Sequence, residues 1–125
     1  MAEARFFERS GRQILLIDIA NADLEGVVEV VRQTKALIAE SGRRDLLTLT
    51  DVTGTDVNSA VVKVLKDFVT NNGPFVRAGA VVGLDRVRAM EFLAIVKFSG
   101  RNLKAFTHFD AAAQWLITQA SSSSA

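Results

Sequence analysis

Strand-sized apolar runs alternate in this sequence with longer segments whose apolar residues recur at helical spacing. The runs are bounded by polar or glycine-containing turns, which predicts strands over residues 14–19, 46–52, 75–82 and 103–106. The helical pattern predicts helices over 24–38, 61–69, 85–98 and 110–117. Because successive parallel strands need long crossovers, which helices supply, we expect an α/β fold with a mostly parallel central sheet.

The amino terminus adds an antiparallel strand to this expected sheet. Phe6 and Phe7 precede a Ser10-Gly11 turn, so a hairpin opens the fold. The whole chain then has about five strands and about four helices. Its 125 residues, 49% of them hydrophobic, suffice for one packed core. We therefore expect a single domain over 1–118 and a disordered serine-rich tail over 119–125.

The composition excludes several classes of protein. The 15 Lys and Arg residues are balanced by 14 Asp and Glu residues, so the basic excess of a nucleic-acid binder is missing. The absence of cysteine excludes disulfides and thiolate metal sites. The apolar runs are far shorter than the roughly 20 residues of a membrane span, and charged residues over 1–12 leave no secretory signal. We expect a cytoplasmic protein with no membrane span.

A search for catalytic groups finds little. His108 is the sole histidine, so sites with several histidines are impossible, and we expect it to play a structural role. The first strand of the parallel sheet is followed by Ala20-Asn21-Ala22-Asp23 instead of a glycine-rich phosphate loop. Asp18 and Asp51 end adjacent strands, where turn formation explains them as well as acid–base or Mg²⁺ chemistry does. We expect no enzyme activity, no cofactor and no metal.

The connection from Asp51 to Ser59 is the first candidate site. It joins a strand to a helix at the sheet edge where open parallel sheets bind ligands. A phosphoserine at Ser59 would be favoured by the helix N-terminus. Alternatively, Asp56 or Asn58 caps the helix and Ser59 is an ordinary first-turn residue. The candidate partner-binding or phospho-switch residues are Asp51, Thr53, Thr55, Asp56, Asn58 and Ser59.

This loop and the order of elements resemble the STAS domain, and most closely its divergent SpoIIAA-like branch, the anti-sigma-factor-antagonist-like proteins. The resemblance covers nearly the whole chain. It implies a cytoplasmic, non-enzymatic module that binds proteins or small ligands, with a phosphorylatable serine at the position of Ser59. Asn58 stands where the family usually has Asp, and Ala60 and Val61 replace a small Ser/Gly pair. The Phe106–Leu116 stretch, with Trp115 in an alanine-rich helix, fits the divergent branch better.

The helix after Gly83 is the second candidate site. Between Ala89 and Phe98 its charged residues are Glu91 and Lys97, so apolar surface extends beyond one face. Another helix of the chain, a second copy in a homodimer, or an apolar ligand could cover this excess. The patch residues are Phe68, Met90, Phe92 and Phe98, with Arg86 or Arg88 as an anion contact.

Two functions fit these features. The leading hypothesis is a regulatory module that docks a protein partner through residues 53–59 and the start of the following helix. The alternative is a carrier or sensor of a small apolar or acidic ligand, by analogy with the lipid-transfer fold that is sometimes grouped with STAS domains.

Overall fold

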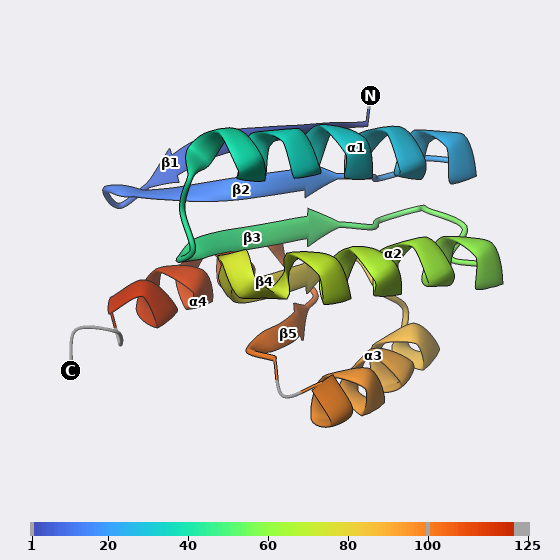
Figure 1. Ribbon diagram of the computed structural model, residues 1–125. Helices are drawn as coiled ribbons and strands as arrows, with labels where there is room; N and C mark the ends of the chain where they lie inside the picture. The colour runs from blue at the N-terminus through green and yellow to red at the C-terminus, as the bar shows by residue number, and fades with distance from the viewer. Residues whose placement is uncertain (1, 100, 122–125) are drawn as a thin grey trace.

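The computed structural model describes the backbone of residues 2–99 and 101–121, and their side chains except those of 95–99 and 121. The described chain forms one five-stranded sheet and four α-helices, as the sequence pattern predicted (Figure 1). In chain order the elements are β1 (Glu3–Arg9), β2 (Arg12–Asp18), α1 (Leu24–Ser41), β3 (Leu46–Asp51), α2 (Ser59–Asn72), the short 3-10 helix η1 (Gly73–Phe75), β4 (Val76–Val82), α3 (Arg86–Ser99), β5 (Leu103–Phe106) and α4 (Phe109–Ser121).

The strands lie in the sheet in the order in which they occur in the chain, β1-β2-β3-β4-β5. The β1–β2 pair is antiparallel, and the remaining neighbours run parallel. Ser10 and Gly11 between β1 and β2 have φ angles of 52° and 77°. Two consecutive positive φ angles are typical of the type I′ turn that suits a two-residue hairpin. The predicted hairpin and the mostly parallel sheet are both confirmed.

The helices are divided unequally between the two faces of the sheet. Right-handed crossovers that always step in the same direction place their helices on the same face. Accordingly α1, α2 and α3 lie on one face, and α4, which follows the last strand, lies on the other (Figure 1). Among the described elements, α4 is therefore the one helix that covers that second face.

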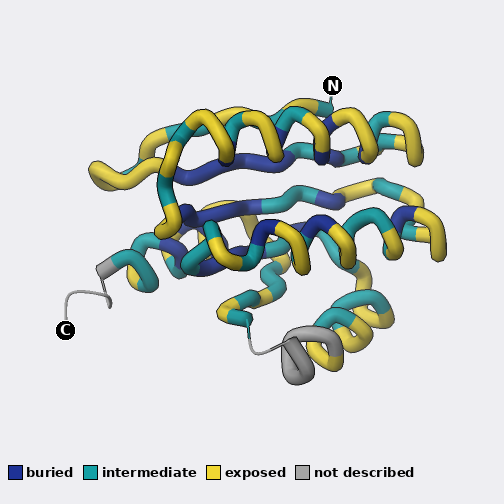
Figure 2. Tube along the Cα trace, in the orientation of Figure 1, coloured by how far each residue is buried: buried dark blue, intermediate teal, exposed yellow. Residues whose placement is uncertain are grey.

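Both faces of β2 are buried, which explains its nearly continuous apolar sequence. Leu15 and Ile17 belong to the core on the α1 side, and Ile14 and Leu16 belong to the core on the α4 side. Figure 2 shows the middle of β2 in the dark blue of buried residues. The core on the α4 side is completed by small residues of β4 and α4 and by larger side chains: Leu47, Leu49, Ala78, Ala80, Val82, Ala112, Ala113 and Leu116. Small side chains allow α4 to approach the sheet closely.

Helix ends follow the capping residues with small differences from the prediction. Asp23 caps α1 by accepting a hydrogen bond from the Gly26 N–H at 2.8 Å, and Gly42 ends the helix with a φ of 64°. Helix α4 begins at Phe109, one residue before the predicted Asp110. It continues to Ser121, beyond the domain boundary expected at 118, and residues 122–125 lie outside those described.

Replacing Leu116 with alanine tests the dependence of the second face on α4. The Leu116 side chain is fully buried, so we expect the free energy of unfolding to fall by about 2–5 kcal/mol. Urea denaturation would measure the change, with Gln114→Ala on the exposed side of the same helix as the control, expected within about 0.5 kcal/mol of the parent. A loss below about 1 kcal/mol for Leu116→Ala would contradict this account.

Candidate functional site

The loop after β3 uses most of its polar side chains to build its own turn. The Asp51 carboxylate accepts hydrogen bonds from the Thr53 N–H at 3.0 Å and from the Thr53 hydroxyl at 2.6 Å. The Thr55 hydroxyl donates to the carbonyl of Ile19, at the end of the neighbouring strand. Asn58 caps α2, because its side-chain oxygen accepts from the Val61 N–H at 3.0 Å. The structure thus selects Asn58 over Asp56 as the cap.

The remaining two loop candidates are exposed at the rim of the sheet. The Asp56 side chain points to solvent, and Ser59 is the first residue of α2. Within the described residues, no hydrogen bond involves the Ser59 hydroxyl. Ser59 borders a shallow depression between α2 and α3 that contains Lys66 and two ion pairs, Lys63 with Asp67 at 3.8 Å and Arg88 with Glu91 at 3.0 Å.

The two strand-end aspartates act as turn acceptors. Asp18 and Asp51 are register partners on β2 and β3, so they do lie side by side. Asp18 accepts from the Ala20 N–H at 3.0 Å, much as Asp51 accepts from Thr53. Across the described residues, no three His, Cys, Asp or Glu side chains gather in a way that could hold a metal ion.

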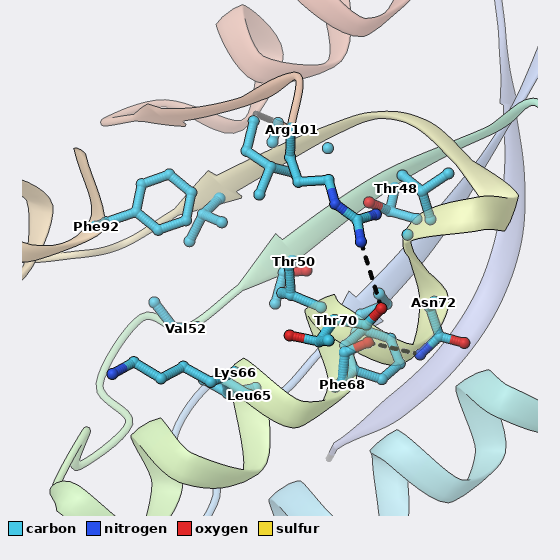
Figure 3. Close-up of a pocket in the computed structure, with 18 of the residues that line it drawn as sticks. Thr48, Thr50, Val52, Leu65, Lys66, Phe68, Thr70, Asn72, Phe92 and Arg101 are labelled. Atoms are coloured by element: carbon cyan, nitrogen blue, oxygen red, sulfur yellow. Dashed lines mark hydrogen bonds between the residues drawn. The ribbon is translucent and has the colours of Figure 1, made fainter. Parts of the chain in front are cut away.

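A cavity of about 560 Å³ lies between α2, α3 and the sheet (Figure 3). Its floor consists of residues from β3, β4 and β5. Its walls are mostly apolar, with Leu65, Phe68 and Val69 on α2 and Phe92 and Ala94 on α3. Sites for small molecules commonly have volumes of roughly 300–1,000 Å³ and apolar linings with a few polar groups. This cavity has both properties.

The floor of the cavity contains two threonines in the middle of the sheet. Side chains alternate along β3, so Thr48 and Thr50 point to the α2 side while Leu47 and Leu49 point to α4. On β4, a Cβ atom on Gly79 would lie 2.9 Å from the Thr48 hydroxyl oxygen and 2.7 Å from a Leu103 methyl carbon. Glycine at this position therefore lets the Thr48 and Leu103 side chains pack closely over the backbone of β4.

Arg101 extends into the cavity from the segment between α3 and β5 (Figure 3). One of its guanidinium N–H groups donates to the Thr70 carbonyl, near the end of α2, at 3.3 Å. A Cβ atom on Gly73 would lie 1.2 Å from the Arg101 Nη1 atom, so the guanidinium occupies the space that any larger residue would need. The adjacent Asn102 carbonyl accepts a hydrogen bond from the Gly79 N–H at 2.9 Å, which fixes this segment to β4.

The predicted patch is divided between the cavity and the outer surface. Phe68 and Phe92 line the cavity, and so does Arg88, whereas Arg86 is exposed elsewhere on α3. Met90 is 67% exposed and lies outside the lining, with Val87 and Leu93 as exposed neighbours on α3. The Phe98 side chain lies outside the described residues. The apolar surface of this helix thus reaches both the cavity and the solvent.

Sequence reasoning missed Thr48, Thr50 and Arg101. The threonines carried a signal, because two hydroxyls occupy alternate positions in a central strand that is otherwise apolar. Arg101 carried none, because its place depends on how the segment after α3 crosses toward Gly73.

The contact between Gly73 and Arg101 gives a stability prediction. Replacing Gly73 with alanine should displace the guanidinium from Thr70 and lower the free energy of unfolding by about 1 kcal/mol. In an Arg101→Ala background the same change should be neutral or stabilising, because nothing then occupies the space and alanine favours helical backbone. Urea denaturation of all four proteins measures the coupling. An equal effect of Gly73→Ala in both backgrounds would show that the contact does not exist.

Comparisons with known proteins show the fold. No protein-family model matches the sequence, and no curated protein matches it. Among solved structures it is similar to an uncharacterized protein of the DUF3478 family from Shewanella loihica PV-4, described as having a SpoIIAA-like fold. The two chains share 13% identity with a TM-score of 0.73, over 93% of this chain and 95% of the other.

None of the helices in the described ranges is long and apolar enough to cross a bilayer.

The similarity to the solved structure confirms the fold expected from the resemblance in the sequence: this chain has the SpoIIAA-like α/β fold.

Proposed function

We propose that this protein binds one small, largely apolar molecule in the cavity between α2, α3 and the sheet, as a carrier or sensor. The observation that carries the proposal is the cavity itself, about 560 Å³ in volume and walled by apolar side chains of two helices. An apolar space of this size gains free energy when a ligand with matching surface replaces water. This was the alternative hypothesis from the sequence, and the geometry supports it better than loop docking.

The polar groups of the 51–59 loop give the second reason for this preference. Asp51, Thr53, Thr55 and Asn58 are hydrogen-bonded within the fold. Groups with internal partners contribute less to an interface, because a new partner must replace an existing hydrogen bond. Apolar side chains in the cavity walls can contact a ligand without the loss of an internal hydrogen bond.

A matched pair of substitutions tests the cavity. Val81 lines the floor, so Val81→Phe should fill part of the space and weaken binding of the neutral dye Nile red at least about tenfold. Val87, 64% exposed on the outer side of α3, receives the same change as a control and should leave the affinity within about twofold. Fluorescence titration measures both affinities, and circular dichroism checks folding.

Equal dye affinity in the two variants would contradict the proposal, as would the failure of the parent protein to bind any apolar probe. Native mass spectrometry of freshly purified protein adds an independent measurement. A co-purified small molecule that is lost in Val81→Phe and kept in Val87→Phe supports the cavity as the binding site. The same spectra report whether the chain forms the homodimer expected from the exposed apolar residues of α3.

Ser59 favours a second candidate function, regulated binding of a protein partner. Its hydroxyl is exposed in the first turn of α2, and Lys63 lies four residues further along the helix. A negative charge at this position would interact favourably with the helix N-terminus and with a lysine one turn away. Phosphorylation at Ser59 would therefore be tolerated and would add negative charge to the exposed surface at the start of α2.

The phospho-switch predicts a difference between two variants. Ser59→Glu should be more stable than Ser59→Ala by about 0.3–1 kcal/mol in thermal or urea unfolding at low salt. Phosphopeptide mass spectrometry of protein from its native cells should find phosphate on Ser59. Equal stability of the two variants together with unmodified Ser59 would argue against the switch.

A further inference from the structure

We infer that two copies of this chain pair through β1, antiparallel and with Phe6 opposite the partner's Phe6, so that their two sheets join into one. The strand β1 forms the upper margin of the sheet in Figure 1. It has seven residues and pairs with β2 along its whole length without a bulge, whereas the other edge strand, β5, has four. Long, regular edge strands without proline are the ones that pair with another chain.

Alternate residues of β1 direct their backbone groups away from β2. The two-residue turn that follows Arg9 makes Arg9 a hydrogen-bonded position of the hairpin, and hydrogen-bonded positions recur at every second residue before it. The backbone groups of Ala4, Phe6 and Glu8 therefore point outward. The Ala4 N–H confirms this direction, because it donates to the Gln33 side chain at 3.2 Å. Among the described residues nothing accepts from the N–H groups of Phe6 and Glu8.

The charges on β1 exclude most ways of pairing two copies. Like charges that lie opposite each other on paired strands are unfavourable, which is how charged residues protect an edge. An antiparallel pair centred on Arg5 places two copies of Arg5 opposite each other. A pair centred on Phe7 places Arg5 opposite the partner's Arg9, and a pair centred on Glu8 brings two glutamates together. These three registers are therefore unfavourable.

The register centred on Phe6 has no such conflict. It places Glu3 opposite the partner's Arg9 at both ends of the pair, and Arg5 opposite the partner's Phe7. The two copies of Phe6 face each other with their backbone groups outward, so each donates a hydrogen bond to the other. The Phe6 side chain is half-buried on the α1 side, and a second phenylalanine directly opposite would cover more of it.

A register centred on Ala4 also avoids like charges, but it fits the edge less well. It uses only the first half of β1, and its central hydrogen bonds need the Ala4 N–H that Gln33 already binds. In the register centred on Phe6, Ala4 lies away from the centre. Its carbonyl can there accept from the N–H of the partner's Glu8 while Gln33 keeps the Ala4 N–H.

The ion pairs already present on β1 are compatible with this arrangement. Arg5 contacts Glu3 at 3.2 Å, and Arg9 contacts Asp110 at 3.1 Å. The side chains of Glu3, Arg5 and Asp110 are more than half exposed, and exposed ion pairs contribute little to stability. The avoidance of like charges, and not the gain of a new ion pair, therefore selects the register.

Glu8→Pro tests the backbone pairing. Proline lacks the N–H that would donate to the partner, and its ring takes the place of the partner strand, whereas an outward position on an edge strand tolerates it. Sedimentation velocity of the full chain should show a dimer for the parent and for Glu8→Ala, which keeps the N–H. Glu8→Pro should raise the dimer dissociation constant at least about tenfold. Circular dichroism checks that the variant is folded.

Charge reversal tests the register even if Glu8→Pro does not fold. Glu3→Arg places like charges opposite each other at both ends of the pair, and so does Arg9→Glu. Each variant alone should raise the dissociation constant at least about tenfold. An equal mixture of the two should dimerise about as tightly as the parent, because opposite charges then meet at both ends. A purely structural role for either residue would not produce this recovery.

Two further variants separate this dimer from the other surfaces of the molecule. Met90→Gln, on the exposed side of α3, should leave dimerisation unchanged. Val81→Phe should also leave it unchanged, because no residue of β1 lines the cavity. A parent that stays monomeric up to about 1 mM would overturn the inference. So would a dimer that Met90→Gln weakens and Glu8→Pro does not, or a mixture of Glu3→Arg with Arg9→Glu that dimerises no better than either variant alone.

Discussion

The handedness of crossovers between parallel strands determines most of this structure. From β2 onward each strand is placed beside the preceding one and always on the same side, so every intervening helix is directed to the same face. Three helices then lie on one face of the sheet and have to cover the hairpin as well, whereas α4 covers the other face. The layout of the core, the position of the cavity and the exposure of α3 all follow from this one-directional order.

The cavity is a consequence of how the shared face is filled. Helix α1 lies over the hairpin and β2, where Val27, Val30 and Val31 are buried. Helix α3 follows β4 and leads into the edge strand β5, so it lies at the margin of the sheet. Between α2 and α3 the floor contains the side chains of two threonines and the bare backbone of Gly79. The space above this floor and between the two helices forms the cavity, and Arg101 extends into it.

The sequence predicted the architecture far better than the site. Apolar runs bounded by turns identified the parallel strands, the Ser10-Gly11 turn identified the hairpin, and helical spacing of apolar residues identified the four α-helices. The loop residues 51–59 were also correctly located at the sheet edge, but their side chains turned out to stabilise the turn. Arg101 could not be found, because its contact with Gly73 joins segments far apart in the chain. Thr48 and Thr50 could have been found, since burying a hydroxyl in a central strand is unfavourable unless the hydroxyl is hydrogen-bonded.

The position of α4 on its own face has a consequence for synthesis of the chain. Each strand pairs with the one made just before it, so the sheet and the helices of the crowded face can assemble progressively as the polypeptide emerges. Helix α4, which has 13 residues, is synthesised after all of them. Until then Leu47, Leu49 and their neighbours remain uncovered. A nascent chain that stops short of residue 109 therefore exposes a broad apolar surface that is prone to aggregation.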